Sequence, residues 1–311
     1  MGYELRTMVV EPKRQTFDPL VARFGDRPAT RYQEGSFDVQ ATEHFHYRPT
    51  WDPAHELYDV DYSALKLTDN YRYADPRQYY YATYVTDAAA RYEAFAQTLA
   101  YVEDRRLLDR LPEGWRRVLT GAVIPLRHYE QGAQLISSQA ARFSYGTTIS
   151  QAATYAAFDR IGNAQLYSLV GLALAGGGSD ALSEAKENWL SAPSLQPLRR
   201  IVEELLVEKD WASGLVALDL VDARLYPLLF TELDERALAD GAMAYSLIAR
   251  HLSDWYGSQQ KWLAPLLEAW TTDPTYAEAN QKVLADIEDR WQGRATDAVR
   301  AVAKLIDGAV R

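Results

Sequence analysis

From about residue 75 onward, apolar residues recur at alternating intervals of three and four positions, which is the period of one face of an α-helix. The clearest runs, 81–102 and 115–143, are separated by Pro112. We predict one long helix from Pro76 to about Arg106. A second long helix follows the break, and Pro125 is expected to kink it because proline cannot donate the backbone hydrogen bond.

Local signals predict where several helices begin and end. Asp75 precedes Pro76 and Asp273 precedes Pro274, an arrangement typical of a helix N-cap followed by a proline in the first turn. Thr148, with Gln151 three residues later, has the pattern of a capping box. The glycine run 176–178 predicts a helix end. It does not resemble a phosphate loop, because no Lys-Ser/Thr follows it and a helix precedes it.

The remaining periodic segments are also helical, and no segment has a convincing strand pattern. They cover 180–190, 196–207, 209–231, 232–270 and 274–306. We expect four long core helices over 76–106, 113–145, 148–176 and 209–231, the last of them central because it is mostly apolar. Gly162 and Gly171 lower helix propensity, which favours close helix contacts at both positions. The fold class is therefore all-α, a four-helix bundle with additional C-terminal helices.

Residues 1–74 have a different character. They show no sustained helical period, contain five prolines and carry twelve aromatic residues. Such a segment is too aromatic for a disordered tail. A long irregular segment is usually functional, so we predict an extended N-terminal arm that lies either on its own body or on a partner.

Composition narrows the function classes. The 311 residues include 33 basic and 43 acidic side chains, a net charge of −10, which disfavours nucleic acid as a partner. The absence of cysteine excludes disulfides, thiolate metal sites and a cysteine nucleophile. The apolar runs are too short or too interrupted to span a membrane, and no signal peptide stands at the start, so we expect a soluble cytoplasmic protein without membrane contact. The 21 tyrosines against 8 phenylalanines indicate rings at interfaces.

The histidines do not have the spacing of a di-iron bundle, in which two helices each supply Glu-x-x-His and two others each supply a Glu. Among five histidines, Glu-x-x-His occurs once, at Glu43 and His46, and Asp-x-x-His once, at Asp52 and His55. Both pairs lie in the N-terminal arm, so they cannot form half-sites on facing long helices. We therefore predict no metal ligand, no bound cofactor and no catalytic residue in this chain.

Charged residues nevertheless fall on the predicted core helices. Glu130 is followed three positions later by Ala133, and Asp159 by Gly162, so neither belongs to a metal motif. We interpret four charged residues as a buried or interfacial network of ion pairs and hydrogen bonds: Arg127, Glu130, Asp159 and Arg160. His128 is interpreted as a hydrogen-bonded packing residue or an interface contact rather than a general base.

Several stretches resemble one family in the right order over about residues 44–275. They begin with Pro49–Pro53, Leu67–Asp69, Asp75–Tyr81 and Tyr84. The resemblance continues through Pro125–His128 with Glu130, Tyr145–Thr147, Asp159–Gly162, Ala164–Gln165, Lys209–Trp211, Leu215–Ala217, Leu220–Val221 and Tyr226–Leu228. The chain resembles the β subunit of bacterial multicomponent di-iron monooxygenase hydroxylases, with the phenol hydroxylase and toluene monooxygenase type as its nearest match. Asn70, where the phenol hydroxylase type has Trp, is a departure.

The resemblance implies a non-catalytic structural subunit. It implies a ferritin-like domain over 75–311 without iron ligands, and an N-terminal arm over 1–74 that wraps a partner subunit. The partner would be a homologous di-iron α subunit, joined by a small γ subunit in an (αβγ)2 hydroxylase. A reductase with FAD, an iron–sulfur cluster and NADH would supply electrons, and a small regulatory protein would bind transiently. The assembled enzyme would insert one oxygen atom of O2 into phenol or another aromatic ring.

The resemblance and the tyrosine pattern together suggest interface residues. Three consecutive tyrosines at the start of a helix cannot all face one core, so some must face a second surface. The expected interface residues are Trp51, Asp52, Tyr58, Tyr79, Tyr80, Tyr81, Tyr84, His128 and Glu130. Three alternatives stay open: the β subunit of a toluene, alkene or short-alkane monooxygenase, a stand-alone helical interaction protein, and a self-sufficient di-metal enzyme.

Overall fold

A computed structural model describes residues 17–43, 47–50 and 52–310, and all regular elements in these ranges are helical. The all-α prediction is confirmed. The α-helices are α1 (Asp18–Phe24), α2 (Arg31–Ser36), α3 (Tyr81–Asp104), α4 (Glu113–Val118), α5 (Leu126–Phe143), α6 (Thr147–Leu174), α7 (Asp180–Ser191), α8 (Gln196–Leu205), α9 (Trp211–Pro227), α10 (Leu233–Ala239), α11 (Met243–Thr271) and α12 (Ala277–Val310). None of the helices described here combines the length and the apolar character needed to cross a bilayer.

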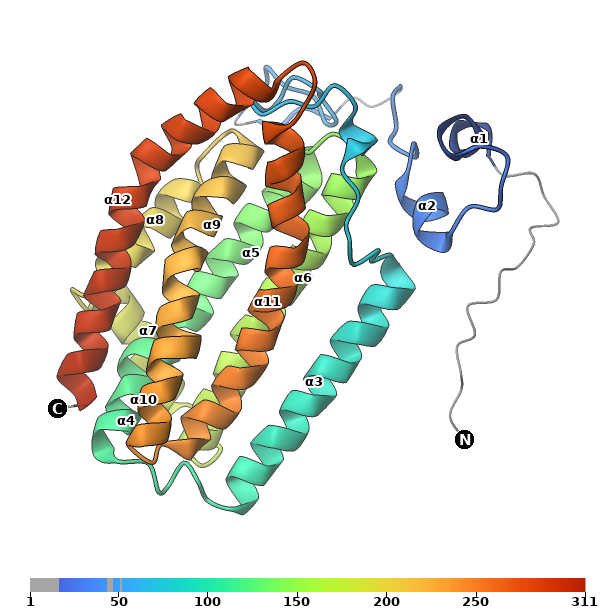
Figure 1. The fold of residues 1–311 in the computed structure, drawn as a ribbon. Coiled ribbons are helices and arrows are strands. Elements are labelled where there is room, and N and C mark those ends of the chain that lie inside the picture. Colours follow the sequence, from blue (N-terminus) through green and yellow to red (C-terminus); the bar gives the residue numbers. More distant parts are fainter. Residues whose placement is uncertain (1–16, 44–46, 51, 311) are drawn as a thin grey trace, which may run out of the picture.

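The helices form a bundle in which α5 and α6 pack against each other along their lengths, behind α9 and α11 (Figure 1). α12 lies along α9 on one flank, and α3 lies along α11 and α6 on the other. Side chains from α5, α6, α9 and α11 meet at the centre. The expectation that 76–106 supplies a central helix is therefore wrong, because α11 takes that place and α3 lies outside.

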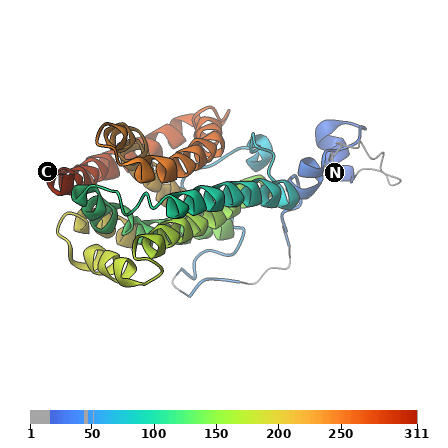
Figure 2. The same cartoon turned by 90° about the horizontal axis from the view of Figure 1, so that it is seen from below.

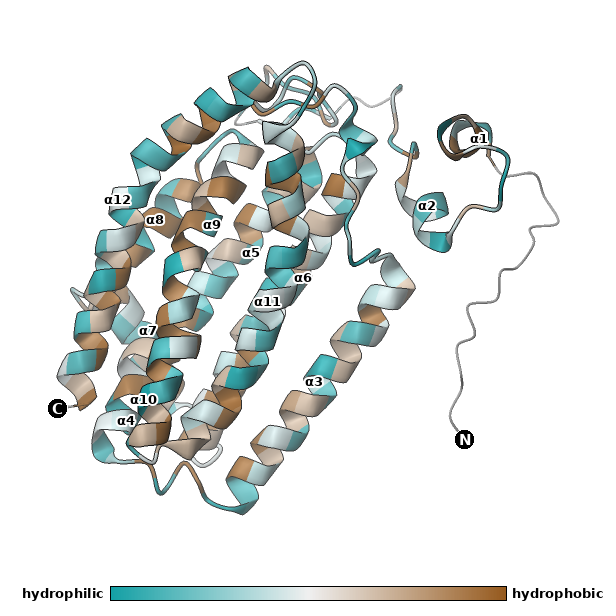
Figure 3. Ribbon diagram, viewed as in Figure 1, coloured by the Kyte–Doolittle hydropathy of each residue, from teal (hydrophilic) through white to brown (hydrophobic). Residues whose placement is uncertain are grey.

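The apolar residues of α3 explain its outer position. Of its 24 residues only five are buried, at the helical spacing expected of a single narrow stripe: Tyr84, Ala88, Phe95, Leu99 and Val102. α11 buries residues along its whole length, including Trp255, Trp262 and Trp270. Hydrophobic and hydrophilic residues alternate along α3 and α12, as expected of helices with one buried face (Figure 3).

The start of α3 differs from the prediction. Asp75 does not cap a helix. Instead the N–H of Gln78 donates to the carbonyl of Asp75 (2.8 Å), and Gln78 has a φ of +51°, which ends the turn. The Asp75 carboxylate is occupied by Arg77, at 2.8 Å from its Nη2. The helix begins only at Tyr81, after Tyr80, whose N–H donates to the Thr83 hydroxyl at 3.1 Å.

Two other helix starts and one helix end were also predicted from sequence. The Thr148 capping box is wrong, because α6 begins after Gly146, Thr148 is buried, and Gln151 accepts a hydrogen bond from the Ser36 hydroxyl (2.6 Å). Asp273 does act as a cap, accepting from the N–H groups of Thr275 and Tyr276. The predicted stop after α6 is confirmed, with the helix ending at Leu174 and three glycines at 176–178.

The second predicted helix is interrupted just before Pro125. A π-helical turn, η2 (Leu119–Val123), separates α4 from α5, and the N–H of Ile124 donates to the carbonyl of Leu119 at 2.8 Å. The wider turn and the missing N–H of Pro125 together account for the predicted kink. A second π-helical turn, η3 (Leu228–Glu232), follows Pro227 at the end of α9.

The N-terminal segment is more structured than predicted. Residues 18–36 contain α1 and α2, which project from one end of the bundle (Figure 2). They have a small core of their own, Arg23 pairs with Asp38 and Asp69 further along the same segment, and Ser36 donates a hydrogen bond to Gln151 of α6. Further along, side chains between Leu57 and Tyr73 join the main core of the bundle. The prediction of an irregular arm over all of 1–74 is wrong in this respect, and part of the segment covers its own body.

The predicted close contacts at the helical glycines are present. A Cβ on Gly162 would lie 1.5 Å from the Tyr92 hydroxyl of α3, and one on Gly171 would lie 2.4 Å from Leu182 of α7. Gly162 therefore sets the distance between α6 and α3.

Replacing Gly162 with Ala should lower the free energy of unfolding by ~1–3 kcal/mol, because the added methyl must displace the Tyr92 ring. Gly257→Ala is the matched control, since nothing lies within 4 Å of its Cβ position in α11. There the better helix propensity of alanine should raise stability by about 1 kcal/mol. Urea unfolding of the two variants measures both effects, and equal stability changes would contradict the contact.

Candidate functional site

The centre of the bundle is occupied by Arg160 of α6, whose side chain has no exposed surface (0%). Its Nη1 donates to Glu130 of α5 at 3.3 Å and to Asp222 of α9 at 3.4 Å, and its Nη2 donates to the second oxygen of Asp222. Both carboxylates are also buried. The guanidinium therefore joins three helices through charge-assisted hydrogen bonds.

Aromatic residues complete this central cluster. The hydroxyl of Tyr226 donates to Glu130 (2.6 Å), and that of Tyr129 donates to Asp222 (2.6 Å). Trp255 of α11 has its ring centroid 4.8 Å from the Arg160 guanidinium carbon, in a cation–π arrangement. All four central helices thus contribute to the surroundings of one cation.

Burial and charge act against each other in the cluster. Burial disfavours a charged guanidinium, yet Asp222, Tyr226 and Glu130 hold the pKa of Arg160 well above its ordinary value. Burial raises the pKa of Glu130, although Arg160 and the Tyr226 hydroxyl oppose that rise. Removing Arg160 would leave the buried carboxyl groups of Glu130 and Asp222 without the positive charge that balances them.

The central cluster does not fit a metal ion. A di-iron bundle needs two Glu-x-x-His motifs on facing helices, whereas an arginine stands in the middle here. The described ranges, 17–43, 47–50 and 52–310, contain no group of three or more His, Cys, Asp or Glu side chains placed to hold a metal. His46 lies outside these ranges, and His55 Nδ1 pairs with Asp52 at 3.0 Å.

The predicted charged network is partly confirmed. Glu130 and Arg160 form its core, but Asp159 and Arg127 do not belong to it. Asp222 is the member that sequence reasoning missed, although an aspartate within the mostly apolar run 209–231 was a signal for it. The interface role expected for Glu130 is wrong, because only 1% of this residue is exposed and it lies inside the bundle.

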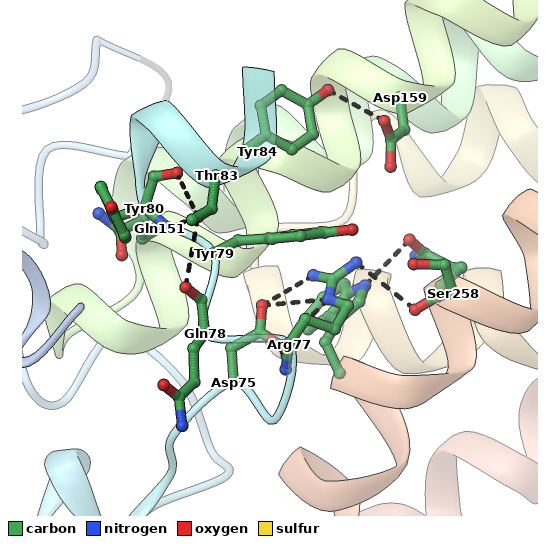
Figure 4. Close-up of polar contacts among 12 residues, drawn as sticks. Asp75, Arg77, Gln78, Tyr79, Tyr80, Thr83, Tyr84, Gln151, Asp159 and Ser258 are labelled. Atoms are coloured by element: carbon green, nitrogen blue, oxygen red, sulfur yellow. Dashed lines mark hydrogen bonds and ion pairs between the residues drawn. The ribbon is translucent and has the colours of Figure 1, made fainter. Parts of the chain in front are cut away.

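Asp159 instead connects α6 to α3. It accepts a hydrogen bond at 2.9 Å from the hydroxyl of Tyr84 (Figure 4) and another at 2.9 Å from Nη2 of Arg91, both on α3. Burial and the nearby Asp159 carboxylate raise the pKa of Tyr84 far above its ordinary value, which keeps its hydroxyl protonated as a donor.

The tyrosines at the start of α3 separate onto different surfaces. Tyr84 stacks on Tyr155 of α6 at 4.3 Å between ring centroids, and Tyr79 meets both rings edge-on. Tyr80 is half-buried and packs against the core of the N-terminal segment. Tyr81 is 72% exposed. Figure 4 shows Tyr79 beside Arg77, which lies between Asp75 and Ser258.

The other expected interface residues lie in several places. Asp52 is buried, and Tyr58 is half-buried against the main core with a φ of +62°. His128 accepts a hydrogen bond from Nε of Arg127 and stacks on Trp189, so its predicted packing role is confirmed. Burial, helped by Arg127, lowers the pKa of His128 to about 4. Trp51 lies outside the described residues.

Comparison with known proteins identifies the family. The model of the methane/phenol/alkene hydroxylases matches residues 51–274. The chain belongs to this family. The predicted resemblance is thereby confirmed.

Individual relatives agree with this assignment. The chain is 38% identical over 309 residues to the oxygenase component DmpL of phenol 2-monooxygenase from Pseudomonas sp. strain CF600, covering 99% of this chain and 92% of the relative. It is 27% identical over 286 residues to the hydroxylase component small subunit of propane 2-monooxygenase from Mycolicibacterium goodii, covering 89% and 77%. A solved chain of phenol hydroxylase from Pseudomonas sp. OX1 superposes with a TM-score of 0.89 at 34% identity, covering 98% of this chain and 94% of that one.

The buried hydrogen bond from Tyr84 to Asp159 should contribute measurably to stability. Tyr84→Phe removes a donor to a buried carboxylate and should lower the free energy of unfolding by ~1.5–3 kcal/mol. Tyr81→Phe is the control, because that exposed side chain should change stability by less than ~0.5 kcal/mol. Denaturant titration compares the two, and equal stabilities would show that Asp159 does not depend on the Tyr84 hydroxyl.

Proposed function

We propose that this chain is the non-catalytic β subunit of the hydroxylase component of an NADH-dependent phenol or aromatic monooxygenase. In this role it supports a di-iron α subunit, which hydroxylates the aromatic ring with O2. The central observation is the arginine–carboxylate cluster at the place where a ferritin-like bundle would hold its metal. Family membership and the phenol 2-monooxygenase relative support the reaction class.

The proposed assembly follows the names of the relatives. One relative is called an oxygenase component and another the small subunit of a hydroxylase component. The word "small" supports the presence of a larger partner subunit. We extend this to an (αβγ)2 hydroxylase with a small γ subunit. Di-iron belongs to the α subunit, and FAD, the iron–sulfur cluster and NADH belong to a reductase. The reductase and a regulatory protein bind transiently.

The outward face of α3 supports a large subunit contact. From Tyr81 to Tyr101 the exposed positions are alanines, threonines, Val85, Gln97, Glu93 and the two terminal tyrosines, and the partly exposed Asp87 is paired with Arg91. Such a face is unusual on a chain with a net charge of −10. α3 lies at the edge of the bundle, beside α11 (Figure 1).

Exposed apolar residues on α6 extend this face. Phe158, Ile161 and Leu169 are each more than 40% exposed, and the Phe158 ring lies 6.1 Å from that of Tyr84. Small alanines let a partner helix approach closely, and the larger apolar residues supply area to bury. We assign this surface, the outward face of α3 with the exposed apolar residues of α6, to contact with the α subunit. The expected interface roles of Tyr79, Tyr80 and Tyr81 are compatible with it.

Charge placed on the α3 face should prevent assembly. The double substitution Ala90→Glu with Ala94→Glu adds two carboxylates to exposed positions, so co-purification with a co-expressed α subunit should fall at least about tenfold, since a buried unpaired charge costs several kcal/mol. Ala285→Glu on an exposed site of α12 is the matched control and should assemble normally. Unchanged assembly of the double variant would show that the contact lies elsewhere.

Activity measurements test the subunit role itself. NADH-dependent phenol hydroxylation by the α subunit, with reductase and regulatory protein present, should require this chain, and assembly-deficient variants should fail in proportion to lost assembly. Full activity without this chain would contradict the proposed function.

A further inference from the structure

The centre of the bundle has the organisation of a cation-binding site. Glu130 from α5, Asp222 and Tyr226 from α9 and Trp255 from α11 all surround one positive group. In metal-binding ferritin-like bundles the acidic ligands likewise come from facing helices and surround the cation. Here the cation is part of the chain, because it is the guanidinium of Arg160.

The hydrogen bonds of Arg160 are made by the two terminal nitrogens of its guanidinium group. Nη1 and Nη2 donate to the carboxylates, whereas Nε is buried and has no hydrogen-bond partner. The linkage through Nε therefore adds no hydrogen bond to the site. A free guanidinium ion could make the same hydrogen bonds.

The aromatic walls favour this kind of cation. The ring centroids of Trp255 and Tyr226 lie 4.8 Å and 5.6 Å from the guanidinium carbon. Planar, weakly hydrated guanidinium interacts well with aromatic faces and makes two parallel bonds to a carboxylate. A small metal ion would need several oxygen or nitrogen ligands, which these rings do not provide.

The charges near the cluster leave an unbalanced carboxylate pair once the arginine is removed. Asp219, one turn before Asp222 on α9, is a further acidic group, and its pKa is raised to about 7 by burial and by Asp222. Arg91, the other arginine of this region, is engaged by Asp87 and Asp159. Without Arg160, the buried carboxyl groups of Glu130 and Asp222 have no cation to balance them.

We propose that the bundle centre is a guanidinium-binding site which Arg160 occupies from within the chain, and that Arg160→Ala converts it into a site for free guanidinium. The truncation creates the space for the ion, while Glu130, Asp222, Tyr226 and Trp255 remain to bind it. This chain therefore completes its own core without a metal. The proposal concerns this chain alone and does not depend on what the assembled enzyme oxidises.

Thermal unfolding of the full-length Arg160→Ala chain, with guanidinium added at about millimolar concentrations far below those that denature, tests the proposal. Guanidinium should raise the unfolding midpoint with the logarithm of its concentration above its Kd, with the folding constant increasing about tenfold when the ion reaches ten times its Kd. Urea and sodium chloride at the same concentrations should give no such rise. The wild-type chain, whose site is filled, should show none with guanidinium either.

Two further variants separate a specific site from general stabilisation. Arg160→Ala combined with Asp222→Asn removes the carboxylate that accepts two of the hydrogen bonds, and the guanidinium effect should disappear. Arg91→Ala removes a half-buried arginine outside the cluster, so guanidinium should not raise the unfolding midpoint of this variant. If Arg160→Ala responds no more than wild type, or equally with and without Asp222→Asn, the proposal is overturned.

The proposal can be tested even if Arg160→Ala folds poorly. If Arg160→Ala is isolated unfolded, refolding yield with and without guanidinium becomes the measurement. A folded fraction that appears only with guanidinium, and not with urea or sodium chloride, supports the site. Equal yields in all three additives contradict it.

Discussion

The ion pairs of Arg160 with Glu130 and Asp222 are the interaction on which the rest of the structure depends. They lie at the point where α5, α6, α9 and α11 converge, and no water-exposed surface remains on the arginine. A buried ion pair of this kind adds little stability over a well-packed apolar core. Removing one of its partners nevertheless lowers the free energy of unfolding strongly, because the other charge stays buried without a counter-charge. Together with Trp255 of α11, which packs on the guanidinium, these ion pairs bring side chains of all four helices into contact with one group.

Another buried carboxylate, that of Asp159, extends these contacts outward to α3. Asp159 directly precedes Arg160 on α6. Its side chain therefore leaves the helix in a different direction, toward α3, where Tyr84 and Arg91 donate hydrogen bonds to it. α3 is thereby fixed to the bundle by one stripe, while its opposite face stays nearly free of charge. α3, of whose 24 residues only five are buried, is thus also the helix to which we assign the contact with another chain.

Sequence periodicity was sufficient for the fold class and for the presence of the long helices, because both follow from local spacing, but it missed α1 and α2. It also indicated that Glu130 and Arg160 belong to a buried network. It could not pair them with Asp222, because that partner lies 62 residues from Arg160 and only the packing of α9 brings it near. At Asp75 the cap signal was overridden by another local contact, since Arg77, two residues further on, occupies the carboxylate. Which tyrosines meet a partner depends on a second chain and not on periodicity.

The central claim is that Arg160 takes the place of a metal, so that this chain is complete without iron. Metal analysis of the full-length chain, expressed alone in iron-rich medium and purified without chelators, tests it most directly. The account predicts far less than one iron per chain and an unfolding midpoint that does not change on adding a chelator. Stoichiometric iron, lost on substituting Glu130 or Asp222, would contradict it.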